Sequence, residues 1–299
     1  MQGMSEQRDF TKGHGTENDF VLLPDPDGTG DLSAEQVRRL ANRRAGIGGD
    51  GVIRVVPTRA AAEPEVRAQA GAAEWFMDYR NADGGVAEMC GNGTRVFAAY
   101  LRREGLQTGS ELRIATRAGV KQVRFEDGGL IAVNLGPWRF VGQARDGTGR
   151  GAHEEAGSAA PSVAVTVGQW APLVGTLLDL GNPHTVVRLP PGMDLDSLDL
   201  TRAPVVRPEP GSGTNVELVE LLGPGALRMR VHERGVGETR SCGTGAAAAA
   251  LAARRWTGDV VDVWRVEVPG GTLRVSVLPG QEVELAGPAE LVADGVVRL

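Results

Sequence analysis

The sequence predicts an α/β fold of the α+β type, in which two pseudo-symmetric halves each wrap a curved, mostly antiparallel sheet around a central helix. Three observations lead to this expectation. The chain has 299 residues, which at roughly 150 residues per domain is enough for two domains. A Cys-Gly-polar-Gly motif occurs twice, about half a chain length apart, as an internal duplication would produce. The 43 Gly and 17 Pro residues indicate many turns between short strands.

Each copy of the motif is followed by an apolar run that is typical of a buried helix. The second run, Ala246–Ala253, carries no charge on any face. Because alanine is the best helix former, we expect this run to be a helix in the core. Asn92 and Thr244 are favourable N-cap residues, and this would place Cys90 and Cys242 just upstream of a helix N-terminus.

Alternating apolar and polar residues predict strands in both halves. Leu278-Pro279-Gly280 is a turn between two of these strands. A stretch rich in Gly, Ser and Arg, from Gly142 to Ser158, lacks periodicity and is expected to be a surface loop. The expected strands cover residues 130–135, 261–268, 273–277 and 282–285.

Composition and charge disfavour several classes of protein. Hydrophobic residues make up 41% of the chain and charged residues 23%, as in a soluble globular protein. The net charge of −6 disfavours nucleic acid and anionic membranes as partners. The longest apolar run, 246–253, is far shorter than the roughly 18 residues that span a bilayer. The N-terminus has no apolar signal segment, so a cytoplasmic protein is expected.

The two cysteines, Cys90 and Cys242, have a chemical use at a helix N-terminus. Free backbone N–H groups and the positive end of the helix dipole stabilise a thiolate there. The same N–H groups bind a carboxylate. A single buried cysteine is more often only a small hydrophobic residue. Two copies that use every cysteine of the chain instead favour one shared ligand that carries a carboxylate.

Two thiols without a cofactor suit the inversion of a stereocentre. One thiolate removes the Cα proton from one face, and a thiol returns a proton to the other face. The usual cofactor of amino-acid racemisation, pyridoxal phosphate, needs a Schiff-base lysine. Lys12 and Lys121 are the two lysines of the chain, and neither has a marked context. No cofactor is therefore expected. Two cysteines are too few for a cysteine zinc site, and no metal is expected either.

Further polar motifs surround the two cysteines. Asn81 and Glu233 each precede a cysteine by nine residues. With these motifs the chain resembles the diaminopimelate epimerase family over essentially its full length. The segments that carry the resemblance are N-D-F at 18–20, G-I-G-G-D-G at 46–51, N-A-D-G-G-V-A-E-M-C-G-N-G-T-R at 81–95, G-N-P-H at 181–184, T-N-V-E at 214–217 and E-R-G-V-G-E-T-R-S-C-G-T-G-A at 233–246.

The resemblance implies a fold and a set of site residues. The halves would comprise 1–133 with 288–299 and 134–287, and the active site would lie in the cleft between them. Cys90 and Cys242 would be the proton-transfer pair, and His184 and Glu233 would tune the two thiols. The residues implied to bind substrate are Asn18, Asn81, Gly91, Asn92, Asn182, Asn215, Glu233, Arg234, Gly243 and Thr244.

The resemblance also implies a reaction, the interconversion of LL- and meso-diaminopimelate for lysine and peptidoglycan precursors. It further implies a cytoplasmic homodimer whose partner is this small-molecule substrate, and neither nucleic acid nor a membrane. Three positions depart from the family pattern. Gly51 stands where some members carry a substrate-contacting Gln, Gly85 where Ser is common, and His232 where Tyr is common.

Three other interpretations compete with this one. A proline or hydroxyproline racemase-like enzyme also uses two cysteines, but a cyclic imino acid has no distal amino-acid end to engage Arg234 and the asparagines. A thiol-redox protein would pair Cys90 with Cys242, yet the chain lacks Cys-x-x-Cys. The third alternative is a non-catalytic module that binds a dicarboxylate.

Overall fold

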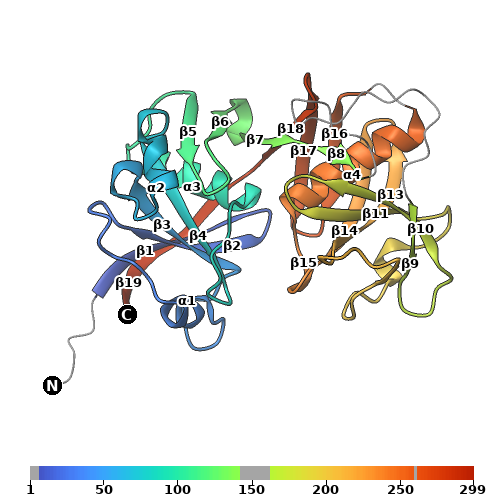
Figure 1. The fold of residues 1–299 in the computed structure, drawn as a ribbon, viewed down its shortest axis with the longest axis horizontal. Helices are drawn as coiled ribbons and strands as arrows, with labels where there is room; N and C mark the ends of the chain where they lie inside the picture. Colours follow the sequence, from blue (N-terminus) through green and yellow to red (C-terminus); the bar gives the residue numbers. More distant parts are fainter. Residues whose placement is uncertain (1–6, 142–161, 259–260) are drawn as a thin grey trace. The chain divides into compact units, whose positions relative to one another are not determined.

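The computed structural model describes residues 7–141, 162–258 and 261–299. The expected loop 142–158 lies outside these residues. The chain divides into two compact units (Figure 1). Unit 1 comprises the chain up to Val133 together with Gly287–Leu299, and unit 2 comprises Asn134–Ala286.

Unit 1 is a mixed, mostly antiparallel sheet around helix α3. The N-terminal strand β1 pairs on one side with β2 and on the other with the C-terminal strand β19. Two further helices and the turns between them lie outside this sheet. The elements are β1 (Gln7–Gly15), β2 (Asn18–Pro24), α1 (Ala34–Ala41), β3 (Gly51–Pro57), α2 (Pro64–Arg67), β4 (Trp75–Asn81), α3 (Gly91–Arg103), β5 (Glu111–Ala115), β6 (Lys121–Phe125), β7 (Ile131–Pro137) and β19 (Glu290–Arg298), with short 3-10 helices η1 (Thr58–Ala60), η2 (Ala68–Gly71) and η3 (Asp127–Gly129).

Unit 2 has the same plan around helix α4. Its elements are β8 (Arg139–Phe140), β9 (Ser162–Thr166), β10 (Leu173–Asp179), β11 (Pro183–Arg188), η4 (Leu195–Ser197), β12 (Val205–Arg207), β13 (Asn215–Gly223), β14 (Ala226–Glu233), β15 (Gly237–Thr239), α4 (Gly243–Thr257), β16 (Val263–Val268), β17 (Gly271–Leu278) and β18 (Glu282–Gly287). The expected strands 273–277 and 282–285 are confirmed within β17 and β18. The strand expected from residue 261 begins two residues later, at Val263.

The strand pairings repeat between the units. In unit 1, β1–β2, β3–β4 and β5–β6 are antiparallel, whereas β2–β3 and β4–β5 are parallel. In unit 2, β10–β11, β13–β14 and β16–β17 are antiparallel, whereas β11–β13 and β14–β16 are parallel. The helix follows the fourth of these strands in both units. The predicted fold class, a mostly antiparallel α+β fold in two similar halves, is confirmed.

The register of these pairs defines equivalent positions in the two units. Phe20 lies opposite Gly51 in the β2–β3 pair, and His184 lies opposite Asn215 in the β11–β13 pair. Counting along the strands from these partners gives the further equivalences. They are Asn18 with Asn182, Ile53 with Glu217, Asp78 with Arg230, and Asn81 with Glu233.

Helix α4 is buried on every side, as the sequence predicts. Residues Ala246–Ala253 are all at most 2% exposed. The helix packs against strands β10, β11, β13, β14, β16 and β17 (Figure 1). Small alanine side chains let the helix backbone approach the strands closely. Gly258 ends the helix in the left-handed conformation, with φ 59°.

Candidate functional site

Cys90 is itself the N-cap of α3. Its backbone is extended (φ −139°, ψ 120°), and its carbonyl accepts a hydrogen bond from the Thr94 N–H at 2.8 Å. Its Sγ accepts from the Gly93 N–H at 3.4 Å. The expectation that Asn92 caps this helix is therefore wrong. The sulfur takes the role of the capping side chain, and Asn92 lies inside the first turn, where its side chain is used elsewhere.

Asn18 and Asn92 hold each other beside this sulfur. Asn18 Oδ1 accepts from Asn92 Nδ2 at 3.1 Å and from the Cys90 thiol at 3.7 Å. Asn18 Nδ2 donates to Asp50 Oδ2 at 2.7 Å. Because the carboxylate can only accept, Asp50 decides which end of the Asn18 amide faces the cysteine. Sequence reasoning gave Asp50 no role; a lone carboxylate in the glycine-rich segment 46–51 was the available signal.

A buried cation lies in the first turns of α3. Arg95 is 0% exposed, and its Nη1 donates to Asn92 Oδ1 at 3.0 Å. Its Nε donates to the Pro288 carbonyl at 3.3 Å. Burial lowers the pKa of Arg95 to about 10, and the charge of Cys90 acts in the opposite direction. Arg95 therefore stays protonated at neutral pH, and its charge adds to the helix dipole in favouring an anion at Cys90.

Cys242 is likewise the N-cap residue of α4, so the expectation for Thr244 is wrong, but here the side chain of the N-cap cysteine makes no capping hydrogen bond. The Cys242 carbonyl accepts from the Ala246 N–H at 2.9 Å, and its backbone is extended (φ −122°, ψ 115°). Its Sγ lies 3.6 Å from Thr244 Oγ1. Cys242 is only 6% exposed, whereas Cys90 is half-buried.

The surroundings of Cys242 favour the neutral thiol. Burial raises the pKa of Cys242 well above its ordinary value, and the carboxylates of Glu233 and Glu217 raise it further. The Thr244 hydroxyl and the Gly245 N–H act in the opposite direction and do not outweigh them. Cys242 is therefore protonated at neutral pH when the site is empty.

A hydrogen-bonded row of side chains leads away from Cys242 through Thr244. Asn182 Nδ2 donates to Thr244 Oγ1 at 3.3 Å, and Asn182 Oδ1 lies 3.0 Å from His184 Nε2. His184 Nδ1 lies 2.6 Å from Glu217 Oε1, and both of these side chains are fully buried. Burial raises the pKa of Glu217, and His184 opposes that rise. Sequence reasoning gave Glu217 no role, although it ends the quoted T-N-V-E segment.

Three further candidates lie together at the ends of β13 and β14. Asn215 Oδ1 accepts from the Arg234 backbone N–H at 2.9 Å. Glu233 accepts from the Thr239 hydroxyl. The Arg234 side chain is exposed, and its guanidinium donates to the Ser212 carbonyl. Among the described residues a single backbone carbonyl holds this guanidinium, so it can turn toward an anionic ligand.

Asn81 stands apart from the other candidates of unit 1. It is exposed at the end of β4, where its backbone closes a turn with Gly84 and Gly85 at 2.9 Å each. Gly51 lies opposite Asn81 on the paired strand β3, and a Cβ at Gly51 would lie 2.4 Å from Tyr79 Cε2 of β4. The Tyr79 ring therefore occupies the space that a longer side chain at position 51 would need.

Apart from Asn81, the candidates thus form one group in each unit. Each group has a thiol at a helix N-terminus, and a helix leaves its first N–H groups without intrahelical partners. These groups belong to Gly91 and Asn92 in unit 1 and to Gly243 and Thr244 in unit 2. The arrangement can bind a carboxylate and exchange a proton with a carbon next to it.

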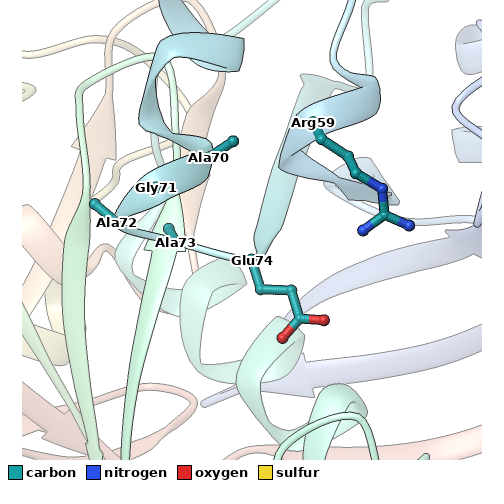
Figure 2. A pocket seen from close by; sticks show the side chains of 6 residues that line it. All are labelled: Arg59, Ala70, Gly71, Ala72, Ala73 and Glu74. Atoms are coloured by element: carbon teal, nitrogen blue, oxygen red, sulfur yellow. The ribbon is translucent and has the colours of Figure 1, made fainter.

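Other features of the described residues do not compete with these two groups. A pocket of about 300 Å³ is lined by Arg59, Glu74 and residues 70–73, and contains none of the candidates (Figure 2). Within the described ranges, His, Cys, Asp and Glu side chains form no group of three or more that could hold a metal ion. In the same ranges, every helix is too short or too polar to cross a membrane.

Comparison with known proteins supports the predicted resemblance. The family model described as diaminopimelate epimerase matches residues 10–141 and 176–292. The diaminopimelate epimerase of Thermobifida fusca is 48% identical over 97% of this chain and 98% of its own length. Among solved structures, a PhzF-family phenazine biosynthesis protein of Bacillus anthracis matches with a TM-score of 0.65 and 17% identity, over 98% of this chain and 100% of that one. A hydroxyproline epimerase of Agrobacterium vitis matches with a TM-score of 0.62 and 17% identity, over 99% and 94%. At such identities the solved structures show a shared fold only.

Proposed function

Because this chain belongs to the diaminopimelate epimerase family, we propose that it interconverts LL- and meso-diaminopimelate by proton transfer between two cysteines, with no cofactor. The predicted family is confirmed by the match over nearly the whole chain. The observation that carries the proposal is the repeated site, a cysteine N-cap beside an amide in each unit.

In the proposed reaction one thiolate takes the Cα proton, and the electron pair of the broken C–H bond moves into the α-carboxylate as an enediolate. The N–H groups of a helix N-terminus stabilise that charge. The second thiol gives its proton to the opposite face of Cα and becomes a thiolate. The reaction requires that both thiols reach the same carbon.

The charges around the cysteines suit a division of labour in the resting enzyme. Cys90 has the buried cation Arg95 behind it, whereas Cys242 has the carboxylates Glu217 and Glu233 around it. We assign Cys90 as the resting base and Cys242 as the resting acid. Turnover of the other stereoisomer starts from the reverse protonation, since the two roles exchange with direction.

The remaining candidates would hold the two amino-acid ends of the substrate. Arg234 suits a bidentate contact with the distal carboxylate. Amide groups suit the ammonium and carboxylate groups, and His184 and Glu233 would tune the thiols. The amides proposed for this role are Asn18, Asn81, Asn182 and Asn215. The proposal includes a cytoplasmic homodimer, and light scattering of the purified protein tests its mass.

Incorporation of solvent deuterium tests the proposed reaction directly. The enzyme is incubated in D₂O with meso-diaminopimelate, and with L-proline and trans-4-hydroxy-L-proline as matched alternatives. We expect deuterium at Cα of diaminopimelate only, detected by mass spectrometry and by loss of the Cα proton signal in NMR. Exchange into proline or hydroxyproline alone, or no exchange into any of the three, would refute the proposal.

A further inference from the structure

Equivalent positions beneath the two helices carry opposite kinds of residue. In unit 1 the pair is Phe20 and Ile53, and the Phe20 ring meets the Tyr79 ring edge-on at 5.8 Å. In unit 2 the equivalent pair is His184 and Glu217. All four side chains are fully buried. The fold can therefore be built with an apolar pair at this place.

The glycines one turn into each helix confirm that these positions face the helix. A Cβ on Gly93 would lie 3.3 Å from Ile53 Cδ1 and 3.4 Å from Phe20 Cε1. A Cβ on Gly245 would lie 2.8 Å from Glu217 Oε1 and 3.3 Å from Cys242 Sγ. Glu217 thus lies directly against the turn of α4 that carries the cysteine.

A buried carboxylate and imidazole are costly where apolar side chains would serve. Removing charges from water carries a large desolvation penalty, and apolar replacement of a buried ion pair is often neutral or stabilising. Glu217 Oε2 is also buried without a hydrogen-bond partner among the described residues. The pair is therefore unfavourable for packing alone, and its use lies in what His184 holds.

Each unit orients one amide beside its cysteine with an acidic residue. In unit 1, Asp50 binds Asn18 directly at 2.7 Å. In unit 2 the equivalent amide, Asn182, meets His184, and His184 in turn meets Glu217. The carboxylate is one residue further from the amide in unit 2, with the imidazole between them.

We propose that Glu217 is the positioning residue of the Cys242 site: it accepts a hydrogen bond from His184 Nδ1–H and thereby keeps Nε2 facing Asn182 Oδ1. Asn182 Oδ1 can only accept, so His184 holds it by donating Nε2–H when both ring nitrogens carry a proton. This role rests on the proposed function, in which Asn182 and Thr244 surround the reacting thiol. With Nδ1 fixed as the donor, the imidazole ring cannot turn over, and the Asn182 amide keeps its hydrogen bond to Thr244.

Substitutions that copy unit 1 test this role. Glu217→Ile places the residue of position 53 in unit 2 and removes the acceptor, whereas Glu217→Gln retains an oxygen that accepts from Nδ1–H. Partners that orient a functional imidazole are commonly worth about 10- to 100-fold. We expect kcat to fall at least about tenfold in Glu217→Ile, with KM changed less than about threefold. Glu217→Gln loses the charge but keeps the acceptor, so its kcat should stay at least about threefold above that of Glu217→Ile.

Two controls separate positioning from packing. Glu220→Ile removes a half-buried carboxylate from the same strand, and kcat should stay within about twofold. The double variant His184→Phe/Glu217→Ile copies the whole apolar pair of unit 1. It should melt at or above the temperature of Glu217→Ile while losing activity, because its apolar pair leaves no unpaired imidazole. Glu217→Ile with full kcat, or Glu217→Gln as impaired as Glu217→Ile, would overturn the proposal.

A measurement without substrate distinguishes this proposal from the proposed reaction. In the ¹⁵N-labelled wild type, Nδ1 of His184 should carry a proton that exchanges slowly with water, and Glu217→Ile should lose that protection. If the slowly exchanging Nδ1 proton is found but the wild-type protein has no epimerase activity, the proposed reaction is refuted and the role of Glu217 is still supported. A His184 ring with no proton on Nδ1 would overturn the role itself, even if Glu217→Ile failed to fold.

Discussion

The N-termini of α3 and α4 have the same geometry and opposite electrostatics. Both are capped by a cysteine that lies beside a hydrogen-bonded polar pair, Asn18–Asn92 in unit 1 and Asn182–Thr244 in unit 2. A buried arginine lies behind Cys90, whereas two carboxylates surround Cys242. Environments that push two titratable groups apart favour one as the base and the other as the acid.

The difference extends through the strands beneath each helix. Unit 1 has an apolar pair facing α3 and an ionic pair, Arg54 and Asp78, on the other side of β3 and β4. Unit 2 has a polar pair, His184 and Glu217, facing α4, and on the other side Leu218 joins a hydrophobic cluster. Strand pairing and helix packing are thus the same in both units, whereas equivalent buried positions can carry either apolar or polar side chains.

The largest expected effect is loss of either thiol. Cys90→Ala and Cys242→Ala should each lower kcat by about 10²–10⁴-fold, because a general acid and a general base act on opposite faces and neither replaces the other. Epimerase assays and circular dichroism on the same samples measure activity and folding. A folded variant of either kind with substantial activity would show that the two sites are not used together.

Asp78→Asn should destabilise unit 1 by about 1.5–3 kcal/mol, because it removes a buried, charged hydrogen-bond acceptor. Arg54 keeps Asp25 as a partner and Arg117 keeps Glu63, so neither arginine loses its last counterion. Asp78 is 2% exposed and binds Arg54 at 2.9 Å and Arg117 at 2.6 Å. Urea unfolding measures the change. Glu238→Gln is the control in unit 2, since it removes only a surface partner of Arg230 and should cost at most about 1 kcal/mol.

The same carboxylate predicts a pH dependence. Burial raises the pKa of Asp78, but the hydrogen bond and charge of Arg117 and the charges of Arg80 and Arg54 leave it below its ordinary value. This stabilisation is fully present above about pH 4, the range of an unfolded aspartate, and is lost as pH falls through the folded pKa. Unfolding free energies from about pH 6 downward should fall less steeply in Asp78→Asn; equal slopes would contradict the assignment.

Arg234→Lys tests a feature that unit 2 has and unit 1 lacks. The equivalent position in unit 1 is Ala82, one residue after Asn81. Lysine keeps the charge and loses the paired donors, so kcat/KM for diaminopimelate should fall roughly 10- to 150-fold, the worth of a charge-assisted hydrogen bond. An unchanged kcat/KM, within about twofold, would remove Arg234 from the site.

The two helix glycines give a matched pair of substitutions. Gly245→Ala forces a methyl group to 2.8 Å from Glu217 Oε1, whereas Gly93→Ala meets only apolar side chains, at 3.3–3.4 Å, which can give way by a few tenths of an ångström. We expect kcat to fall about tenfold or more in Gly245→Ala and less than about threefold in Gly93→Ala. Steady-state kinetics and melting temperatures of both variants test this expectation. Equal losses of kcat would show that the polar side chains beneath α4 matter no more to activity than the apolar ones beneath α3.

The two thiols should also differ in reactivity, without any loss of activity or stability. At pH 7.5 iodoacetamide should label Cys90 at least about tenfold faster than Cys242, since each unit of raised pKa lowers the thiolate fraction tenfold. Peptide mapping by mass spectrometry follows both sites in one sample. Labelling in guanidinium is the control, where the rates should converge; faster labelling of Cys242 in the folded protein would reverse the assigned roles.

The duplicated frame and the two thiols can be predicted from local sequence patterns. The repeated Cys-Gly-polar-Gly motif, the uncharged run Ala246–Ala253 and the alternation in the later strands are local patterns, and local patterns predict helices, strands and their buried faces. The predicted helical run 246–253 lies within α4, but the caps were assigned to the wrong residues. At α3 the Cys90 sulfur accepts the Gly93 N–H, and the Asn92 side chain instead makes tertiary hydrogen bonds.

The contacts that suggest roles for Asp50 and Glu217 are tertiary and could not be predicted from the sequence. The alternation in Asn215-Val216-Glu217-Leu218 shows that Glu217 shares a face with Asn215, but it cannot show what covers that face. Here α4 covers it, so the carboxylate is buried against His184 rather than solvated. A side chain's chemistry depends on its partners and its access to water, and residues distant in the sequence supply both.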